Sequence, residues 1–277
     1  MIANLDLNTP QIMGILNVTP DSFSDGGALY RNGRLDVAIA LDKARVMVAQ
    51  GASIIDVGGE STRPQAQFVA VEEELSRVVP VVEAIARDLD VAISVDTSTP
   101  EVMSAVASVG AHLLNDVRAL QQPGAISAAV SSGLPVCIMH MHGQPKTMQN
   151  NPQYSNVVAE VVDFFQTRLA VLQAAGIDRD KILLDPGFGF GKTAEHNLQL
   201  LNQLPELKQW GCPVLVGISR KSLFQHVLGR PVSDRLAGSL AGALLAVQKG
   251  ASVIRVHDVA ATRDVLKFLN SVETANN

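Results

Sequence analysis

Short apolar runs recur eight times along the chain, and each run ends abruptly on polar residues. The runs are rich in Val, Ile and Leu and show no regular alternation of apolar and polar positions. Such runs are typical of parallel strands that are covered on both faces. We therefore predict strands at Ile12–Asn17, Ser53–Ser61, Ala92–Thr97, His112–Asp116, Pro135–His142, Lys181–Gly189, Pro213–Ser222 and Ser252–Asp258.

Segments with helical spacing separate these runs. Val71–Leu89 carries apolar residues three and four positions apart, and Leu35–Gln50 stops at Gly51, a common helix-ending residue. Thr99 followed by Pro100 predicts an N-cap and a first turn. The other predicted helices are Pro100–Val109, Gly124–Ser131, Asn156–Ala175, Glu195–Leu204, Ser233–Lys249 and Thr262–Leu269.

The alternation of strand and helix predicts one (β/α)₈ barrel domain over residues 1–277, with the active site at the carboxyl ends of the strands. An open doubly wound sheet also alternates in this way, but it usually has fewer strands and breaks into two halves. The longest stretches without a predicted strand are Val18–Gly33 and Gly59–Ala70. Loops of that length are typical of lids and binding loops.

Composition narrows the function further. The net charge of −5 and the absence of a basic stripe argue against nucleic-acid binding, although a small anionic substrate remains possible. The N-terminus lacks a signal peptide, and no stretch approaches the roughly 20 apolar residues of a membrane span. We expect a cytoplasmic protein without a membrane partner, in which Cys137 and Cys212 are reduced and structural.

Three strand ends carry groups suited to holding a heterocycle. Asp96, Asn115 and Asp185 would point into one cavity if the barrel closes, and they offer two carboxylates and an amide. Each carboxylate could instead cap its own following loop. A metal site is a weaker alternative, because no His accompanies these groups at ligand spacing.

Basic groups follow the last two predicted strands. Ser219 to Ser222 read SRKS, and a helix is expected to begin near Ser222, at the usual phosphate position of this fold. Arg255 and His257 are two residues apart, share a strand face and could meet one anion. The alternative for Arg255 is a salt bridge with Asp56 or Asp258.

His140 and His142 likewise share a face at the end of the fifth predicted strand and resemble a metal pair. We favour a packing or wall role for them, because no third ligand is evident. The glycine-rich segment Leu184–Lys192 lacks the spacing of a nucleotide-binding motif. The loop after Asn17 contains Phe23, which needs an apolar contact that a substrate could provide.

Seven motifs resemble the dihydropteroate synthase family of the pterin-binding superfamily, in order and over nearly the whole chain. They are NVTPDSFSDGG, DVGGESTRP, SVDT, NDV, LDPGFGFGK, GISRKS and RVHD. The resemblance implies condensation of 6-hydroxymethyl-7,8-dihydropterin pyrophosphate with p-aminobenzoate. The products would be 7,8-dihydropteroate and pyrophosphate, in folate biosynthesis.

The same resemblance assigns roles to individual residues. It implies a pterin site of Asp96, Asn115, Asp185 and Lys221, and a pyrophosphate site of Asn17, Thr62, Arg255 and His257, with Mg²⁺ near Asn17. The p-aminobenzoate site would comprise Phe23, Arg63, Pro64, Lys221 and Ser222, and sulfonamides would compete there. Asp25 would order the first loop and would act in catalysis together with Asp96, Asp185, Lys221, Arg255 and His257. The family also suggests a homodimer.

Two other functions fit the barrel less well. A methyltetrahydrofolate-binding methyltransferase would use the same Asp and Asn cavity with a corrinoid partner, but it needs neither the SFSDGG loop nor the RKS anion site. A silent barrel could bind pterin as a sensor or act as a scaffold. The candidate contacts to ring, metal, anion and second substrate argue for turnover instead, by dissociative substitution.

Overall fold

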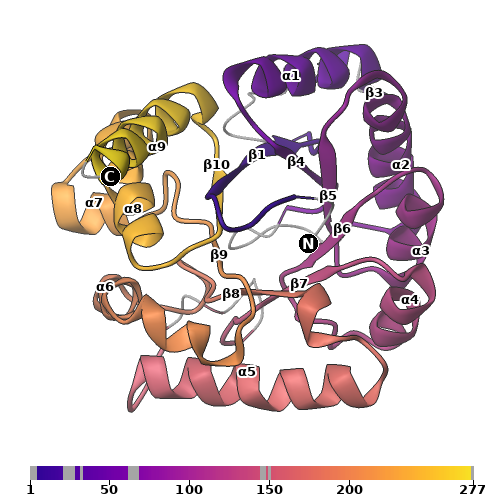
Figure 1. The fold of residues 1–277 in the computed structure, drawn as a ribbon. Coiled ribbons are helices and arrows are strands. Elements are labelled where there is room, and N and C mark those ends of the chain that lie inside the picture. Colours follow the sequence, from indigo (N-terminus) through magenta and orange to yellow (C-terminus); the bar gives the residue numbers. More distant parts are fainter. Residues whose placement is uncertain are drawn as a thin grey trace.

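The computed structural model describes residues 5–20, 29–31, 34–61, 69–143, 148 and 151–275. The eight predicted runs form eight parallel strands, and helices surround them (Figure 1). The strands are β1 Gln11–Asn17, β4 Ile54–Gly58, β5 Ala92–Asp96, β6 Leu113–Asp116, β7 Val136–Met139, β8 Ile182–Asp185, β9 Leu215–Val216 and β10 Val253–Val256. The helices are α1 Val37–Gln50, α2 Val71–Asp88, α3 Pro100–Ser108, α4 Ala125–Ser132, α5 Val157–Ala174, α6 Ala194–Asn202, α7 Leu223–Leu228, α8 Leu236–Gln248 and α9 Val259–Thr274.

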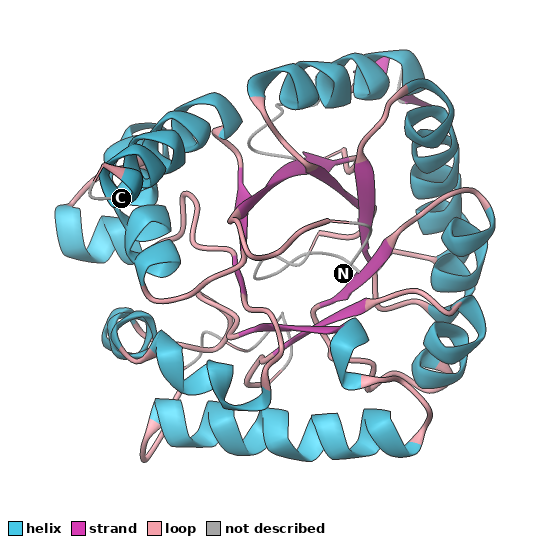
Figure 2. Ribbon diagram, viewed as in Figure 1, coloured by secondary structure: helices cyan, strands magenta, loops and turns pink. Residues whose placement is uncertain are grey.

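The sheet closes on itself. Neighbouring strands pair in the order β8-β7-β6-β5-β4-β1-β10-β9. A parallel bridge between Leu184 and Val214 joins β8 to the residue before β9, and the Leu184 amide donates to the Pro213 carbonyl at 2.9 Å. Figure 2 shows the resulting inner ring of strands and outer ring of helices. The predicted barrel is confirmed, and the open sheet is excluded.

One apolar side chain from each strand fills the barrel interior near the amino ends of the strands. Leu5 and Leu7 of the N-terminal segment pack against this layer. It therefore closes the amino end of the barrel, and the interior is left for polar groups only at the carboxyl end. The layer consists of Met13, Ile54, Ala92, Leu113, Cys137, Leu183, Leu215 and Val253.

The outer face of the strands packs against the helices. α2 illustrates why its sequence is helical, because Val78, Val81, Val82 and Ile85 recur three and four residues apart and are all buried. Burial of each such side chain stabilises the fold by about 1.5–3 kcal/mol. Both faces of each strand are thus covered, which explains the runs without alternation.

Local capping signals mark the starts of α1 and α3. Asp36 accepts hydrogen bonds from the Ala38 and Ile39 amides and caps α1. Thr99 is the N-cap residue of α3 and Pro100 its first residue, as predicted, but the Thr99 hydroxyl makes no capping bond because it donates to the Glu74 carboxylate at 2.6 Å. A contact between α2 and the β5–α3 loop therefore replaces a local cap.

A short antiparallel ribbon follows the first loop. β2 Tyr30–Arg31 pairs with β3 Arg34–Leu35, so the prediction that no strand lies between Val18 and Gly33 is wrong at its end. The Tyr30 hydroxyl donates to the Val18 carbonyl at 2.9 Å. This bond ties the ribbon to the end of β1, beside the expected site.

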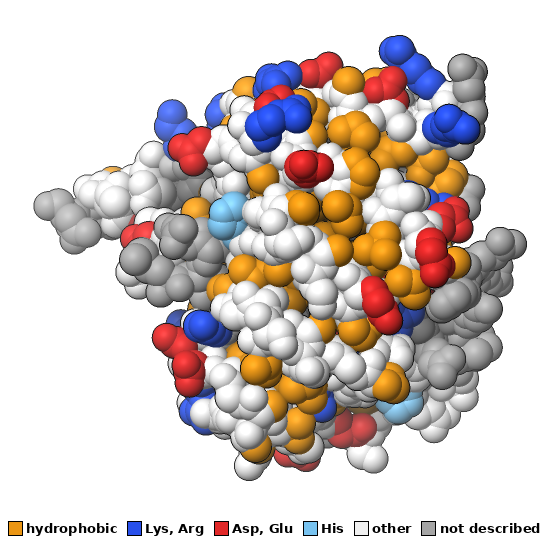
Figure 3. All heavy atoms as spheres, turned by 90° about the vertical axis from the view of Figure 1, so that its right-hand side faces the viewer, with side chains coloured by type: hydrophobic (Ala, Val, Ile, Leu, Met, Phe, Trp, Pro, Cys, Tyr) orange, Lys and Arg blue, Asp and Glu red, His pale blue; other side chains and the backbone are white. Residues whose placement is uncertain are grey.

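The described surface agrees with the charge balance. Within the described residues, no helix is both long enough and apolar enough to cross a bilayer. On the face shown in Figure 3, the coloured basic side chains are scattered among acidic and apolar ones rather than forming a stripe. This face of the described chain therefore lacks the basic track expected for binding nucleic acid.

Candidate functional site

Polar side chains replace the apolar layer at the carboxyl end of the barrel. Side chains alternate between the two faces of a strand, so residues two positions beyond the layer also face the interior. Five of these eight positions are polar, Asp56, Ser94, Asn115, Asp185 and Arg255, and the other three hold Ile15, Met139 and Gly217. The inward face of the strands is thus apolar at the amino end and carries polar and charged side chains at the carboxyl end.

Asp56 of β4 is the centre of this polar group and is fully buried. It accepts hydrogen bonds from the Ser94 hydroxyl at 2.6 Å and from Arg255 Nε at 2.7 Å. The Asn115 amide lies 3.4 Å from both carboxylate oxygens. Asp56 therefore orients side chains of β5, β6 and β10 at once.

Arg255 bridges two carboxylates. Besides its bond to Asp56, its Nη2 donates to Asp96 Oδ2 at 3.0 Å. The structure thus contains the salt bridge to Asp56 that was the alternative interpretation of Arg255, and it adds Asp96. Asp258 does not fill that role, because it pairs with Arg220 at 2.6 and 3.0 Å.

One guanidinium for two buried carboxylates leaves an excess of negative charge. Burial raises the pKa of Asp96 to about 7, Arg255 opposes the shift, and the nearby charge of Asp56 adds to it. Burial acts to lower the pKa of Arg255, but Asp56 and Asp96 outweigh it and raise that pKa. The guanidinium stays charged, while Asp96 is poised to gain or lose a proton.

Asp185 begins the glycine-rich loop after β8. Its Oδ1 accepts from the Gly187 amide at 2.7 Å, so the predicted loop-capping alternative is realised by one of its oxygens. A Cβ on Gly217 would lie 4.0 Å from Asp185 Oδ2 and 3.8 Å from Arg255 Cδ. Burial raises the pKa of Asp185, with the Gly187 amide opposing. Asp185 therefore belongs to the same polar group as Arg255.

Lys221 approaches this group from the loop after β9. Its Nζ lies 4.3 Å from the centroid of the Phe190 ring, within the range of a cation–π contact. A Cβ on Gly189 would lie 3.2 Å from Lys221 Cδ, so glycine leaves room for the lysine chain to pass. Lys221, Asp185 and Phe190 thus flank one space.

His257 lies at the end of β10 with its Nδ1 3.1 Å from the Ser219 hydroxyl oxygen. Burial lowers the pKa of His257 to about 3, and the charge of Arg255 lowers it further. The imidazole is therefore neutral near pH 7. The expected helix begins just after the exposed Ser222, whose side chain lies at the start of α7.

Asn17 ends β1 beside Asp96. A Cβ on Gly58 would lie 3.5 Å from Asn17 Oδ1 and 4.0 Å from Asp96 Oδ2, so both oxygens border the same spot. Mg²⁺ binds oxygen ligands and is often held by one or two protein groups together with substrate phosphates. Among the described residues there is no cluster of three metal-ligating His, Cys, Asp or Glu side chains. This donor set fits a metal ion that is held jointly with a phosphate ligand.

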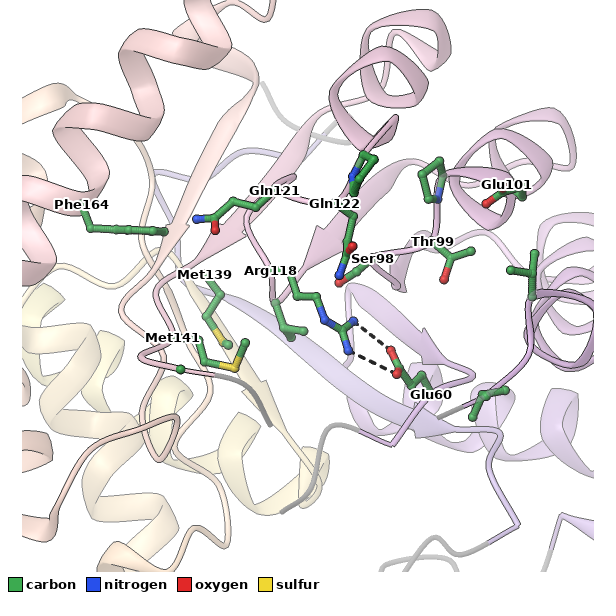
Figure 4. A pocket seen from close by; sticks show the side chains of 16 residues that line it. Glu60, Ser98, Thr99, Glu101, Arg118, Gln121, Gln122, Met139, Met141 and Phe164 are labelled. Atoms are coloured by element: carbon green, nitrogen blue, oxygen red, sulfur yellow. Dashed lines mark hydrogen bonds and ion pairs between the residues drawn. The ribbon is translucent and has the colours of Figure 1, made fainter. Parts of the chain in front are cut away.

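A cavity of about 610 Å³ lies over the ends of β5, β6 and β7. Figure 4 shows Arg118 and Glu60 joined as an ion pair in its lining, with Met139 and Met141 on another wall. The two ion-pair distances are 2.9 and 3.2 Å. Met139 pairs in register with Asp185 on the neighbouring strand, so the cavity adjoins the polar group.

Five predicted site residues lie outside the described part of the chain. They are Phe23, Asp25, Thr62, Arg63 and Pro64. The other eight, from six segments of the carboxyl end, are Asn17, Asp96, Asn115, Asp185, Lys221, Ser222, Arg255 and His257. Of these, Asp96, Asn115, Asp185 and Arg255 meet within the barrel around Asp56.

Sequence reasoning missed Asp56, Phe190 and Lys192 as contributors to the site. Asp56 stands two residues after the inward-facing Ile54, so a strand-face count from the apolar layer would have found it. Lys192 is buried, and its Nζ lies 2.9 Å from His140 Nδ1. No local pattern predicts that contact, because 52 residues separate the two along the chain.

Comparison with known proteins gives one consistent family. A model described as pterin binding enzyme matches residues 13–257. The dihydropteroate synthase of Haemophilus influenzae is 55% identical over 271 residues, covering 98% of this chain and 97% of that protein.

Solved structures agree. The Yersinia pestis dihydropteroate synthase in complex with a sulfonamide drug has a TM-score of 0.94 at 52% identity, covering 98% of this chain and 97% of that one. The Xanthomonas albilineans dihydropteroate synthase has been solved with 4-aminobenzoic acid and with 7,8-dihydropteroate. Those structures have TM-scores of 0.90 and 0.87 at 47% and 45% identity, and each comparison covers 98% of this chain and 96% of that one.

Proposed function

This chain belongs to the pterin-binding enzyme family and, within it, to the dihydropteroate synthases, and from that membership we propose how its strand ends divide the reaction. The reaction condenses 6-hydroxymethyl-7,8-dihydropterin pyrophosphate with p-aminobenzoate, and it yields 7,8-dihydropteroate and pyrophosphate in folate biosynthesis. It is a transferase reaction in which a methylene carbon moves from a phosphate oxygen to an aryl amine. We propose that residues 1–277 act in it as one domain.

The observation that carries the division is the convergence of Asp96, Asn115 and Asp185 around Asp56 and Arg255. We assign the pterin ring to this group. Asp185 would accept from the ring N–H and amino groups, since its Oδ2 faces Gly217 and Arg255 while its Oδ1 holds the loop. Asn115 and Asp96 would complete the ring contacts, and Lys221 would donate to the oxygen and nitrogen edge from above Phe190.

We assign the pyrophosphate to the adjoining end of β1 and β10. Arg255 and His257 share one face of β10, and Asn17 and Thr62 would complete the set. His257 is neutral near pH 7, so it would donate a hydrogen bond rather than a full charge. Asn17 would ligate Mg²⁺, and the bound ion would neutralise charge on the leaving pyrophosphate.

We assign p-aminobenzoate to the outer part of the site. Ser222 is exposed at the start of α7, and Lys221 precedes it. Phe23, Arg63 and Pro64 would form the remaining walls, and Asp25 would order the first loop. Sulfonamides resemble p-aminobenzoate in shape and charge, so they would compete for this pocket.

The proposed chemistry is a dissociative substitution. The C–O bond to pyrophosphate breaks with its electron pair, and the methylene cation that remains is delocalised into the electron-rich dihydropterin. Asp96 and Asp185 stabilise this cation, while Arg255 and His257 stabilise the departing anion. The neutral aniline nitrogen then forms the C–N bond and loses a proton, so the site needs no strong general base.

The test separates the ring end from the anion end. Arg255→Ala should weaken binding of both the pyrophosphate-free pterin and pyrophosphate, because it removes the partner of Asp56 and Asp96. The His257 side chain bonds neither Asp56 nor Asp96. His257→Ala should therefore weaken pyrophosphate binding by about tenfold, which is roughly the contribution of one hydrogen bond to a charged group. It should change pterin binding less than twofold. Calorimetry with each ligand measures both constants.

The wild-type protein supplies the reference. It should release pyrophosphate when both substrates and Mg²⁺ are present, and chelation of Mg²⁺ should slow the release. Absence of release from folded protein would overturn the proposed function. Equal losses of both ligands in His257→Ala would overturn only the division of the site.

Two further properties are proposed from the family rather than from the site. We propose a cytoplasmic location, in keeping with the sequence expectation, and a homodimer. Exposed apolar side chains on α7 and at the start of α8 offer the dimer a candidate surface.

A further inference from the structure

A buried lysine lies behind the proposed pterin site and takes no part in the reaction described above. Lys192 is 3% exposed. Its Nζ lies 2.9 Å from His140 Nδ1, 3.2 Å from the His140 carbonyl, and 3.0 Å from both the Gly187 and Phe190 carbonyls. All four partners can accept when the His140 ring carries its proton on Nε2, so the three N–H groups of the ammonium are shared among four acceptors.

The His140 ring is suited to accept a hydrogen bond from Lys192. Burial lowers its pKa to about 2, and the charge of Lys192 lowers it further, so the ring is neutral. The ring also packs edge-on against Phe164, with centroids 5.0 Å apart. The neutral packing role predicted for His140 thus extends to holding the lysine.

The acceptors belong to two different segments of the barrel. His140 follows β7, whereas Gly187 and Phe190 lie in the loop after β8. The segments are in direct contact, because a Cβ on Gly187 would lie 2.0 Å from the His140 carbonyl oxygen. Burial lowers the pKa of Lys192 to about 7, with the Asp185 carboxylate opposing the shift, so acceptors from both segments surround an amine that still donates N–H bonds in either protonation state. Lys192 therefore joins the two segments where they touch, at a contact with no room for a side chain on Gly187.

The same loop carries two parts of the proposed pterin site. The Gly187 amide donates to Asp185 Oδ1 at 2.7 Å. The Phe190 ring lies 4.3 Å from Lys221 Nζ. A shift of the Gly187 backbone would move the Asp185 carboxylate, and a shift of the Phe190 backbone would move the ring that contacts Lys221. Asp185 and Lys221 are both proposed contacts of the pterin ring.

We propose that Lys192 is a positioning residue for pterin binding, which fixes the Gly187–Phe190 loop against the end of β7 before the ring arrives. Lys192 does not touch the ring in this arrangement. It acts through Asp185 and Phe190, and the inference rests on the pterin site assigned above. Such preorganisation adds affinity because the loop does not have to be ordered during binding.

Lys192→Met tests the proposal, because Met keeps the chain length and removes every donor. We expect it to weaken binding of pyrophosphate-free 6-hydroxymethyl-7,8-dihydropterin by about tenfold or more, which corresponds to about 1.4 kcal/mol. Binding of Mg²⁺-pyrophosphate should change less than twofold, because none of its proposed ligands, Asn17, Thr62, Arg255 and His257, lies in the loop that Lys192 holds. Calorimetry gives both constants.

Two further variants separate positioning from general destabilisation. Lys192→Arg keeps donors and should lose less pterin affinity than Lys192→Met. Lys181→Met is the matched control, since exposed Lys181 bonds the Gly133 carbonyl at the opposite end of β8, and it should bind both ligands as the wild type does.

If Lys192→Met does not fold, as judged by circular dichroism, His140→Phe is used in its place. It removes only the ring acceptor and keeps an aromatic contact with Phe164, and a loss of about threefold in pterin affinity is expected.

The outcomes are distinguishable. A folded Lys192→Met protein that binds pterin within twofold of wild type overturns the proposal, as does an equal loss of both ligands. Unchanged pterin binding by His140→Phe overturns it when only that variant folds. Failure of the wild-type protein to bind pterin would instead overturn the proposed function, and this inference with it.

Discussion

At the scale of single residues, the site depends on an imbalance of buried charge. Asp56 and Asp96 share one guanidinium, that of Arg255, and all three lie at the carboxyl end of the barrel. Ionising both carboxylates leaves one negative charge in a poorly solvated place, so burial raises the pKa of Asp96 to about 7. A ring that develops positive charge would be stabilised by this excess.

Asp96→Asn should change how stability depends on pH. The pKa of Asp96 rises from about 3.8 in the unfolded chain to about 7 in the folded protein. Compared with Asp96→Asn, the wild-type protein should therefore have its highest free energy of unfolding below pH 4. This relative stability should fall as the pH rises to 7. The loss is about 1.4 kcal/mol per pH unit at most, on the order of 4 kcal/mol in total.

Urea unfolding of both proteins at intervals from pH 4 to pH 8 measures this difference. The loss of wild-type stability, relative to Asp96→Asn, should grow as the pH rises to about 7 and should then remain constant. Parallel stability curves for the two proteins over this range would contradict the raised pKa of Asp96.

At the scale of elements, the loop after β8 is built to lie against β7. Its glycines serve this contact rather than a nucleotide: Gly187 has φ of +71°, and a Cβ there would meet the His140 carbonyl. The sequence lacks the spacing of a nucleotide motif, but it could not show which backbone the loop approaches. The contact brings β7, β8 and Lys192 into one unit.

Gly187→Ala should destabilise the protein far more than Gly133→Ala. Both glycines have a left-handed backbone conformation, with φ of +71° and +66°. Alanine at either position should therefore lower the free energy of unfolding by about 1–2 kcal/mol through backbone strain. At Gly133 no described atom lies within 4 Å of the added Cβ, whereas at Gly187 the added Cβ would lie 2.0 Å from the His140 oxygen. We expect a loss on the order of 4 kcal/mol for Gly187→Ala.

The free energies of unfolding of the two variants, measured in urea, isolate the clash from the strain that they share. Losses of equal size would show that the β7 segment moves freely and would argue against a tight seam.

At the scale of the whole molecule, the barrel presents an apolar surface at the start of α8. We define the α7–α8 patch as Val227, Leu228, Val232 and Leu236, which are 44–52% exposed. Exposed apolar groups that lie together are a common feature of protein interfaces. The patch is our candidate interface for the homodimer, which remains a prediction.

The double variant Val232→Asp/Leu236→Asp should convert the dimer to a monomer. Two charges placed in an apolar interface should weaken association by about a hundredfold or more. Light scattering after size exclusion should give twice the chain mass of 29.4 kDa for the wild type and the mass of one chain for the variant.

Val46→Asp provides the control, because Val46 is 55% exposed on α1, away from the patch. It should keep the mass of the wild type. A monomeric wild type, or a double variant that stays dimeric, would rule out the patch as the dimer interface.

Much of the architecture follows from local sequence. Apolar runs without alternation identified all eight barrel strands, because strands covered on both faces need apolar side chains on both. The ribbon at Tyr30 was missed, since strands of two residues are too short to show a period. Thr99 occupies the predicted N-cap position of α3, but its side-chain capping bond is absent because the hydroxyl bonds Glu74, 25 residues earlier, instead.

The sequence by itself determined the barrel and predicted that Asp96, Asn115, Asp185 and Arg255 lie together at the carboxyl ends of its strands. Only the tertiary structure decided how these groups pair: Arg255 with Asp56 and Asp96, and Lys192 with His140. The physical reason is distance along the chain. Periodicity and capping act over a few residues, whereas Arg255 and Asp56 are 199 residues apart and meet only because the closed barrel makes β4 and β10 both neighbours of β1.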